Sequence, residues 1–189
     1  MAKKSAKIEK ILDMAIEVIK SEGDFGLTMR KVASTADMSL SNVQYYFKTK
    51  DDLLKAMADR YFKQCSDELQ AQPAVNSEQE LNSLLTMLLT HVYDLSDMCR
   101  LFREFWAIST RNQVMETYLL EYYKEMSLTM QDKLSPLAKN DECLSQAVSV
   151  LIPFVEGYSI TAKALPRELD SMIELLQSTL LRTLKGSSE

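Results

Sequence analysis

Glycine and proline are scarce in this chain, and their scarcity constrains the fold more than any other feature of the sequence. The 189 residues include four Gly and four Pro, whereas average usage is about 7% and about 5%. Because these residues interrupt helices and shape most tight turns, so few of them favour long helices over a many-stranded β fold. We therefore expect an all-α protein of about nine helices, long enough to bury a core without disulfides or metals.

The spacing of apolar residues and the positions of capping residues divide the chain into helical segments. Apolar side chains recur every three or four residues between Ser5 and Glu22, which is the pattern of an amphipathic helix. Capping residues and prolines set the later boundaries. The expected helices span residues 5–22, 29–35, 40–45, 50–71, 78–96, 100–110, 113–134, 141–164 and 166–184.

The charge of the chain is unevenly distributed between its N-terminal third and the remainder. The overall net charge is −5; 12 Lys and Arg against 9 Asp and Glu give residues 1–63 a net +3, and 10 against 18 give residues 64–189 a net −8. A basic N-terminal region suits a partner that carries phosphates. The signal is modest, because many proteins that bind no nucleic acid show an imbalance of this size.

The sequence carries no recognisable catalytic or metal-binding pattern. It has a single histidine, His91, and no Ser/His/Asp set, phosphate-binding loop or Cys/His cluster. The three cysteines, Cys65, Cys99 and Cys143, lie far apart and are expected to be free thiols in a reducing cytosol. We therefore expect no enzyme activity, no metal and no cofactor.

The N-terminal segment lacks the uninterrupted apolar stretch of a signal peptide. No stretch approaches the roughly 18 uncharged apolar residues of a membrane span. We expect a cytoplasmic protein without a membrane partner.

Residues 28–54 form the most informative stretch of the sequence. Two short helices flank a tight turn at 36–38, and these are the parts of a helix-turn-helix. Ala33 is small where the two helices would cross, and Val32 and Val43 can hold them together. The second helix leaves short polar side chains and tyrosines facing outward, and such groups suit base edges and phosphates in a major groove.

At this stretch the chain resembles the TetR family of bacterial regulators. The family motif reads roughly A-x-x-A-G-V-S-x-G-x-x-Y-x-Y-F-x-[SN]-K-[ED]-x-L. The residues that match it at the same spacing are Ala33, Ala36, Ser39, Tyr46, Phe47, Lys50, Asp51 and Leu53. The departures are Asp37 in place of the usual turn glycine, Ser41 in place of a common glycine and Gln44 in place of a frequent tyrosine. Asp tolerates the backbone of such a turn better than most residues.

The resemblance implies a DNA-binding domain at residues 1–49 and a ligand-binding and dimerisation domain at 50–189. The side chains that it places toward the bases are Leu40, Ser41, Asn42, Gln44 and Tyr45. Those that it places on phosphates are Thr28, Tyr46 and Lys50, and the positive end of a helix would assist Lys50. Three alternatives stay open: Tyr46 as a half-buried core residue, Lys48 as a solvated charge, and a phosphate, minor-groove or merely solubilising role for Lys3, Lys4 and Lys7.

Beyond residue 65 the resemblance is architectural, with two segments, 101–107 and 155–158, that look like the betaine-regulator-type branch of the family. In the family this domain usually encloses a small-molecule pocket. The expected lining residues are Phe102, Phe105, Trp106, Tyr118, Tyr122, Tyr123, Phe154 and Tyr158. With Glu104, Glu121 or Glu156 nearby, such a pocket would take a cationic or amphipathic ligand. The alternative is an aromatic-rich helical core.

The last two expected helices, within residues 141–184, are apolar on more than one face, so each needs cover on more than one side. A second copy of the chain would supply it in a four-helix seam, although both helices could instead be central to their own domain. The resemblance thus implies a homodimeric repressor that binds a palindromic operator in double-stranded DNA and is released by a small-molecule effector. The alternative is a ligand-independent DNA-binding protein of the same type that acts through a protein partner.

Overall fold

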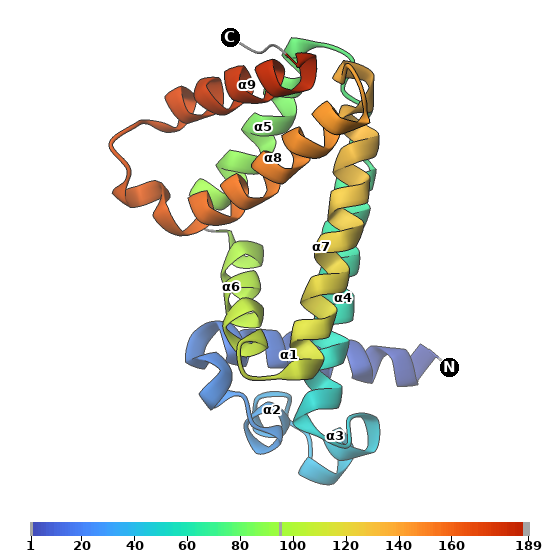
Figure 1. Cartoon of the computed structure of the whole chain (residues 1–189). Helices are drawn as coiled ribbons and strands as arrows, with labels where there is room; N and C mark the ends of the chain where they lie inside the picture. The colour runs from blue at the N-terminus through green and yellow to red at the C-terminus, as the bar shows by residue number, and fades with distance from the viewer. Residues whose placement is uncertain (1, 95, 187–189) are drawn as a thin grey trace. The chain divides into compact units, whose positions relative to one another are not determined.

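The computed structural model describes residues 2–94 and 96–186, with side chains described from Ser5 onward (Figure 1). Within these residues the chain is helical and has no strand, as expected. The elements are α1 (Ala2–Gly26), α2 (Met29–Thr35), α3 (Leu40–Tyr46), α4 (Lys50–Gln70), α5 (Glu78–Tyr93), α6 (Asp97–Ser109), α7 (Gln113–Leu134), the 3-10 turn η1 (Ser135–Leu137), α8 (Asp141–Thr161), the 3-10 turn η2 (Ala162–Ala164) and α9 (Leu169–Lys185).

The helices pack as two compact units. The first unit comprises Met1–Cys65 and Arg100–Tyr122, and the second comprises Ser66–Cys99 and Tyr123–Glu189. Helices α4, α6 and α7 each contribute residues to both units. The expected division at residue 49 concerns roles in binding rather than packing, and it stays a prediction.

In the first unit, α1 supplies an apolar stripe and ends at a glycine. Ile11, Ala15 and Ile19 are fully buried along one side of the helix. At Gly23 the backbone turns to a φ of 67°, a left-handed value that suits residues without a Cβ. Regular α-helix therefore stops where the sequence predicts, and the helical segment continues past this kink to Gly26.

Side-chain caps set the next helix starts. The Thr28 hydroxyl accepts a hydrogen bond from the Lys31 backbone N–H (3.1 Å). The Ser39 hydroxyl accepts one from Asn42 in the same way (3.2 Å). At α4 the bonds are reciprocal, because Asp52 N–H donates to Thr49 Oγ1 and Thr49 N–H donates to Asp52 Oδ2, both at 3.0 Å. This reciprocal pair is a capping box, a motif that fixes the first turn of a helix.

Asp37 occupies the turn between α2 and α3 with a φ of 53°, the one positive φ among the described non-glycine residues. Replacing Asp37 with Gly is expected to raise the free energy of unfolding by roughly 1 kcal/mol, since Gly escapes the Cβ clash of this conformation. The matched control is Ser34→Gly at an exposed helical position of α2, which should lower stability by roughly 0.5 kcal/mol. Urea unfolding measures both; a loss of stability in both variants contradicts the prediction.

In the second unit, α5, α8 and α9 pack against one another around an apolar core (Figure 1). Asn140 caps α8, accepting a hydrogen bond from the Cys143 N–H (2.9 Å). The last helix differs from the expectation that it starts at Pro166: it begins at Leu169, after Glu168 in extended conformation. Pro166 instead lies in the connection that follows η2, so its fixed φ serves a turn rather than a first helical residue.

One helical segment differs from the expectation that no stretch of the chain is long and apolar enough to span a membrane. Asp141–Ala164 is long and apolar enough to cross a membrane by length and composition alone. Core helices of soluble proteins pass the same test. The contacts of α8 with α5 and α9 place this helix in the core of its unit.

Candidate functional site

The helix-turn-helix is held together by a small apolar core. Val32, Ala33 and Val43 are buried where α2 and α3 meet, and Phe47 is buried directly after α3. The turn is tied by a hydrogen bond from the Met38 N–H to the Ala33 carbonyl (2.9 Å). This packing fixes the direction of α3, so its outward side chains form a preorganised surface.

The outward surface of α3 carries the side chains that the sequence assigned to base contact. Ser41, Gln44 and Tyr45 are exposed, Tyr45 by 72%, while Leu40 and Asn42 are partly buried. The Tyr45 ring meets the partly buried Tyr46 ring edge-on at 5.1 Å between centroids. Hydroxyl, amide and phenol groups therefore share one face, and these groups can bond to base edges and phosphates.

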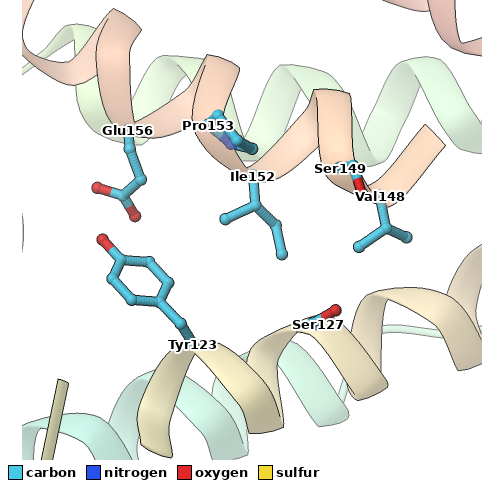
Figure 2. Close-up of a pocket in the computed structure, with 7 residues that line it drawn as sticks. All are labelled: Tyr123, Ser127, Val148, Ser149, Ile152, Pro153 and Glu156. Atoms are coloured by element: carbon cyan, nitrogen blue, oxygen red, sulfur yellow. The ribbon is translucent and has the colours of Figure 1, made fainter. Parts of the chain in front are cut away.

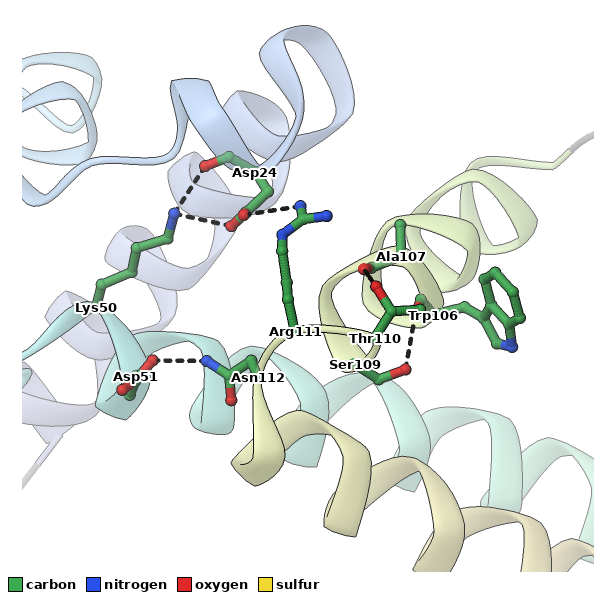
Figure 3. A network of polar contacts seen from close by, with 9 residues as sticks. All are labelled: Asp24, Lys50, Asp51, Trp106, Ala107, Ser109, Thr110, Arg111 and Asn112. Carbon is green, nitrogen blue, oxygen red and sulfur yellow. Dashed lines mark hydrogen bonds and ion pairs between the residues drawn. The ribbon is translucent and has the colours of Figure 1, made fainter.

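Lys50, the expected phosphate anchor, is held by Asp24 (Figure 3). Its ammonium donates to the Asp24 backbone carbonyl (2.7 Å) and pairs with the carboxylate at 2.8 Å. An ammonium has three donors, so one remains for a further acceptor such as a phosphate oxygen. Arg111 binds the same carboxylate at 3.1 Å. Burial alone would raise the pKa of Asp24, but the hydrogen bonds and charges of Lys50 and Arg111 bring it below its ordinary value.

The connection between α6 and α7 takes part in this network, which the sequence analysis missed. The Asn112 side-chain amide donates to Asp51 in the first turn of α4 (2.9 Å), and its oxygen caps α7 by accepting from the Met115 N–H (3.1 Å). Figure 3 shows Arg111 and Asn112 reaching from this connection toward α1 and α4. The loop at 111–112 thus fixes the start of the helix that carries Lys50.

The structure describes only part of the remaining candidates for phosphate contact. Thr28 and Lys48 are exposed, and Lys7 is exposed on α1. The side chains of Lys3 and Lys4 lie outside the described residues.

Three of the aromatic residues expected in a ligand pocket meet in the first unit. Phe102 and Phe105 of α6 and Tyr122 of α7 pack with Tyr61 and Phe62 of α4, and Tyr122 stacks on Phe62 at 4.6 Å between centroids. Phe105 is fully buried. These rings form one aromatic cluster, in which Phe102 and Tyr122 are partly buried.

Two other candidates of the first unit are not members of this aromatic cluster. Trp106 is 54% exposed on α6. Tyr118 is partly buried, with the Lys55 ammonium 5.5 Å from its ring centroid.

Phe154 and Tyr158 belong to the second unit, on α8. Their rings stack at 5.9 Å between centroids, and Tyr158 also stacks with Tyr93 at 6.5 Å. Tyr158 is 2% exposed, and its hydroxyl has no hydrogen-bond partner among the described residues.

A groove of about 480 Å³ lies in the second unit, between α7 and α8 (Figure 2). Of the sequence candidates it contains Tyr123 and Glu156. The lining residues that sequence reasoning missed are Ser127, Val148, Ser149, Ile152 and Pro153. The available signal was the spacing of Val148, Ile152 and Glu156, because residues four apart share a face of a helix.

Glu156 is the one acidic residue that lines this groove, and its hydrogen-bond partner is Tyr123. Figure 2 shows the Tyr123 hydroxyl directed at the Glu156 carboxyl from the opposite helix. Burial raises the pKa of Glu156 to about 7, against the lowering effect of the hydrogen bond from Tyr123. Burial, followed by the neighbouring Glu156 charge and hydrogen bond, raises the pKa of Tyr123 well above its ordinary value. Near neutral pH the carboxyl is therefore divided between its charged and neutral forms.

The groups of three or more His, Cys, Asp or Glu that could hold a metal ion are absent from the part of the chain that the structure describes.

Comparison with known proteins places this geometry among transcriptional regulators. A sequence profile described as "Bacterial regulatory proteins, tetR family" matches residues 11–57. An HTH-type transcriptional regulator in the dhlA 5' region of Xanthobacter autotrophicus is 50% identical over 190 residues, covering 98% of this chain and 94% of that protein. The HTH-type transcriptional regulator YttP of Bacillus subtilis is 24% identical over 119 residues, 60% of this chain and 58% of that one.

Solved structures share the fold at low sequence identity. A TetR-family regulator of Mesorhizobium loti has a TM-score of 0.77 at 18% identity, covering 95% of this chain and 96% of its own. The multidrug binding protein EbrR, complexed with ethidium, has a TM-score of 0.71 at 21% identity, covering 94% of this chain and 97% of its own. Helix order and packing are thus shared across nearly the whole length of these proteins.

Proposed function

Because the chain belongs to the TetR family of bacterial transcriptional regulators and is not an enzyme, we propose that it is a homodimeric repressor, released from a palindromic operator by a small molecule. The observation that carries the proposal is the preorganised polar face of α3. Its DNA-binding residues would be Thr28, Leu40, Ser41, Asn42, Gln44, Tyr45, Tyr46 and Lys50. It would act in the cytoplasm, on the nucleoid.

Within this proposal Gln44 and its neighbours read bases, and Lys50 positions the protein on the backbone. Gln44 projects from the middle of α3 and has the two-pronged amide that can pair with adenine. Lys50 stands at the N-terminus of α4, where the helix dipole favours an anion. Asp24, whose carboxylate Arg111 also binds, holds Lys50 while leaving it a free donor.

Selection from random duplex DNA with the purified full chain tests the proposal. The expected product is an inverted repeat whose half-sites lie one helical turn, about 10–10.5 bp, or a multiple of it apart. Recovery of unrelated sequences, or of a single asymmetric site, would argue against a sequence-specific dimer.

Replacing Lys50 with Met is expected to weaken binding to any duplex DNA about tenfold, because each protomer loses a phosphate contact. The slope of log affinity against log salt should fall in magnitude by about 2 for the dimer. Fluorescence anisotropy across a salt series measures both. Lys124→Met, which removes the same charge at an exposed position of α7, is the control; an equal loss there would assign the effect to net charge.

The dimer in this proposal uses the exposed apolar face of α8 together with α9. Val150, Pro153, Gly157 and Ile160 recur at intervals of three and four and are all exposed, Ile160 by 67%. On α9, Leu175 is 43% exposed. A second copy would bury these residues in a seam formed by residues 141–184.

Gly157 tests this seam. Beyond its chain neighbours and the backbone of its own helix, no atom of the described residues lies within 4 Å of where a Cβ would stand. Glycine nevertheless costs a helix about 1 kcal/mol relative to alanine. Close approach of a partner helix would account for a glycine at this position. Replacing Gly157 with Leu is expected to weaken dimerisation roughly 10-fold to 100-fold, an overpacking cost of about 1–3 kcal/mol.

Sedimentation equilibrium measures this dissociation. Thr86→Leu, which adds an apolar side chain at an exposed position of α5, should leave the dimer intact. An unchanged Gly157→Leu dimer would move the interface away from this face of α8.

Release by a small molecule is supported by the fold shared with EbrR, which was solved in complexes with ethidium, proflavin and malachite green. Here the effector would contact candidates among Phe102, Phe105, Trp106, Tyr118, Tyr122, Phe154 and Tyr158, or the groove between α7 and α8. Because only differential affinity shifts a population, the effector must bind the DNA-incompetent state more tightly.

A further inference from the structure

Resting on the ligand release proposed above, we infer that the groove between α7 and α8 binds an organic monocation with an apolar body, for which Glu156 is the counter-ion and Tyr123 the positioning partner. The groove is in the size range of small-molecule sites, at about 480 Å³ against roughly 300–1,000 Å³. Its composition, an apolar surface with one acid, determines the class of ligand.

The apolar surface comes from α8. One side of the groove is lined by Val148, Ile152 and Pro153. Two small hydroxyls come from Ser127 and Ser149. Figure 2 shows Ile152 extending between the two helices, with the Tyr123–Glu156 pair at one end. A ligand that fills this space buries carbon over most of its length and presents one polar group to the acid.

Glu156 lacks a compensating positive charge. No Lys or Arg among the described residues forms an ion pair with it, and the titratable side chains that line the groove are Glu156 itself and Tyr123. A desolvated carboxyl of this kind favours its neutral form, and a nearby cation restores the charged form. The cation missing from the protein is the group that a ligand would supply.

Tyr123 orients the Glu156 carboxylate. Its hydroxyl donates to the Glu156 carboxyl, so the carboxylate is fixed from across the groove. Its ring also borders the groove, and aromatic faces attract organic cations. The structure therefore selects Glu156 from the three acids that the sequence offered, because Glu104 and Glu121 do not line the groove.

The groove and the proposed dimer face are neighbouring sides of α8 that share Pro153. Val148, Ile152 and Glu156 line the groove, whereas Val150, Gly157 and Ile160 form the exposed apolar face. With Pro153 at the border between them, a dimer partner can cover the second face and leave the groove to a ligand.

Titration of the full chain with phenyltrimethylammonium, and with its uncharged isostere tert-butylbenzene, tests the inference. Calorimetry should show binding of the cation and at least tenfold weaker binding of the isostere. Affinity for the cation should be about tenfold higher at pH 8 than at pH 6, following the ionised fraction of a carboxyl with a pKa of about 7.

Three variants sharpen the test. Glu156→Gln should remove the pH dependence and weaken binding at pH 8 at least tenfold. Tyr123→Phe should move the pH midpoint upward, since the carboxylate loses a stabilising donor. Glu125→Gln, at an exposed position of α7, should bind the cation as the natural chain does.

Equal affinity for the isostere, or full affinity in Glu156→Gln, would overturn the inference. Binding seen only in the Gly157→Leu variant, whose dimer is weakened, would also overturn it, because a second copy would then occupy the groove in the natural chain. Operator release is measured separately on the selected DNA. If cation binding depends on Glu156 but leaves the DNA complex intact, the binding site is supported and operator release by this ligand is refuted. If a molecule releases the operator without needing Glu156, operator release is supported and the cation site is refuted.

Discussion

Replacing Gln44 with Ala is expected to reduce affinity for the selected operator between about 30-fold and about 25,000-fold. A good bidentate contact between a side chain and a base contributes about 1–3 kcal/mol of discrimination, and a homodimer would lose it in both half-sites. Gln44 is exposed in the middle of α3, so its truncation leaves the buried Val32, Ala33 and Val43 untouched.

The informative readout is the sequence preference rather than the affinity alone. Repeating the DNA selection with Gln44→Ala should relax one base pair in each half-site, at symmetric positions, and leave the others unchanged. Gln79→Ala, an exposed Gln in the first turn of α5, is the matched control. Uniform weakening across all sequences would move Gln44 from base reading to phosphate contact.

Local sequence rules predicted the helix starts well because their causes lie within four residues. The caps at Thr28, Ser39 and Asn140 each bond to the backbone three residues on, and such short-range geometry is visible in the sequence. The same holds for Asp37, whose positive φ follows from its place in the turn. The start of α9 was misjudged because a proline fits both a first helical position and a turn.

The polar network and the groove could not be predicted in this way, because their partners are distant in sequence. Arg111 and Lys50 share the carboxylate of Asp24. Tyr123 and Glu156 meet only because α7 and α8 face one another across the groove. For the aromatic candidates, composition indicates that Phe102, Phe105 and Tyr122 are apolar, but only the packing shows that their rings meet Tyr61 and Phe62. Their place in an effector site stays a prediction.

Replacing Glu156 with Gln is expected to stabilise the protein, by roughly 3 kcal/mol at pH 8. Folding raises the pKa of this carboxyl from 4.5 to about 7, and each pKa unit corresponds to about 1.4 kcal/mol. Between these two pKa values the folded chain holds a proton that the unfolded chain has lost. The natural chain therefore loses stability as pH rises from 4.5 to 7, whereas the amide does not titrate.

The advantage of Glu156→Gln should accordingly grow by roughly 2 kcal/mol between pH 5.5 and pH 8.5. Urea unfolding at a fixed protein concentration measures it, since the stability of a dimer depends on concentration. Glu125→Gln should show no such trend. If Glu156→Gln stabilises the protein equally at every pH, the carboxyl is not a buried titrating group. If it destabilises the protein at every pH, other groups of the free protein already stabilise the ionised Glu156.

If the pH trend appears, a saturating monocation should remove most of it, because the bound ligand would supply the positive charge that stabilises the ionised Glu156 in the folded state.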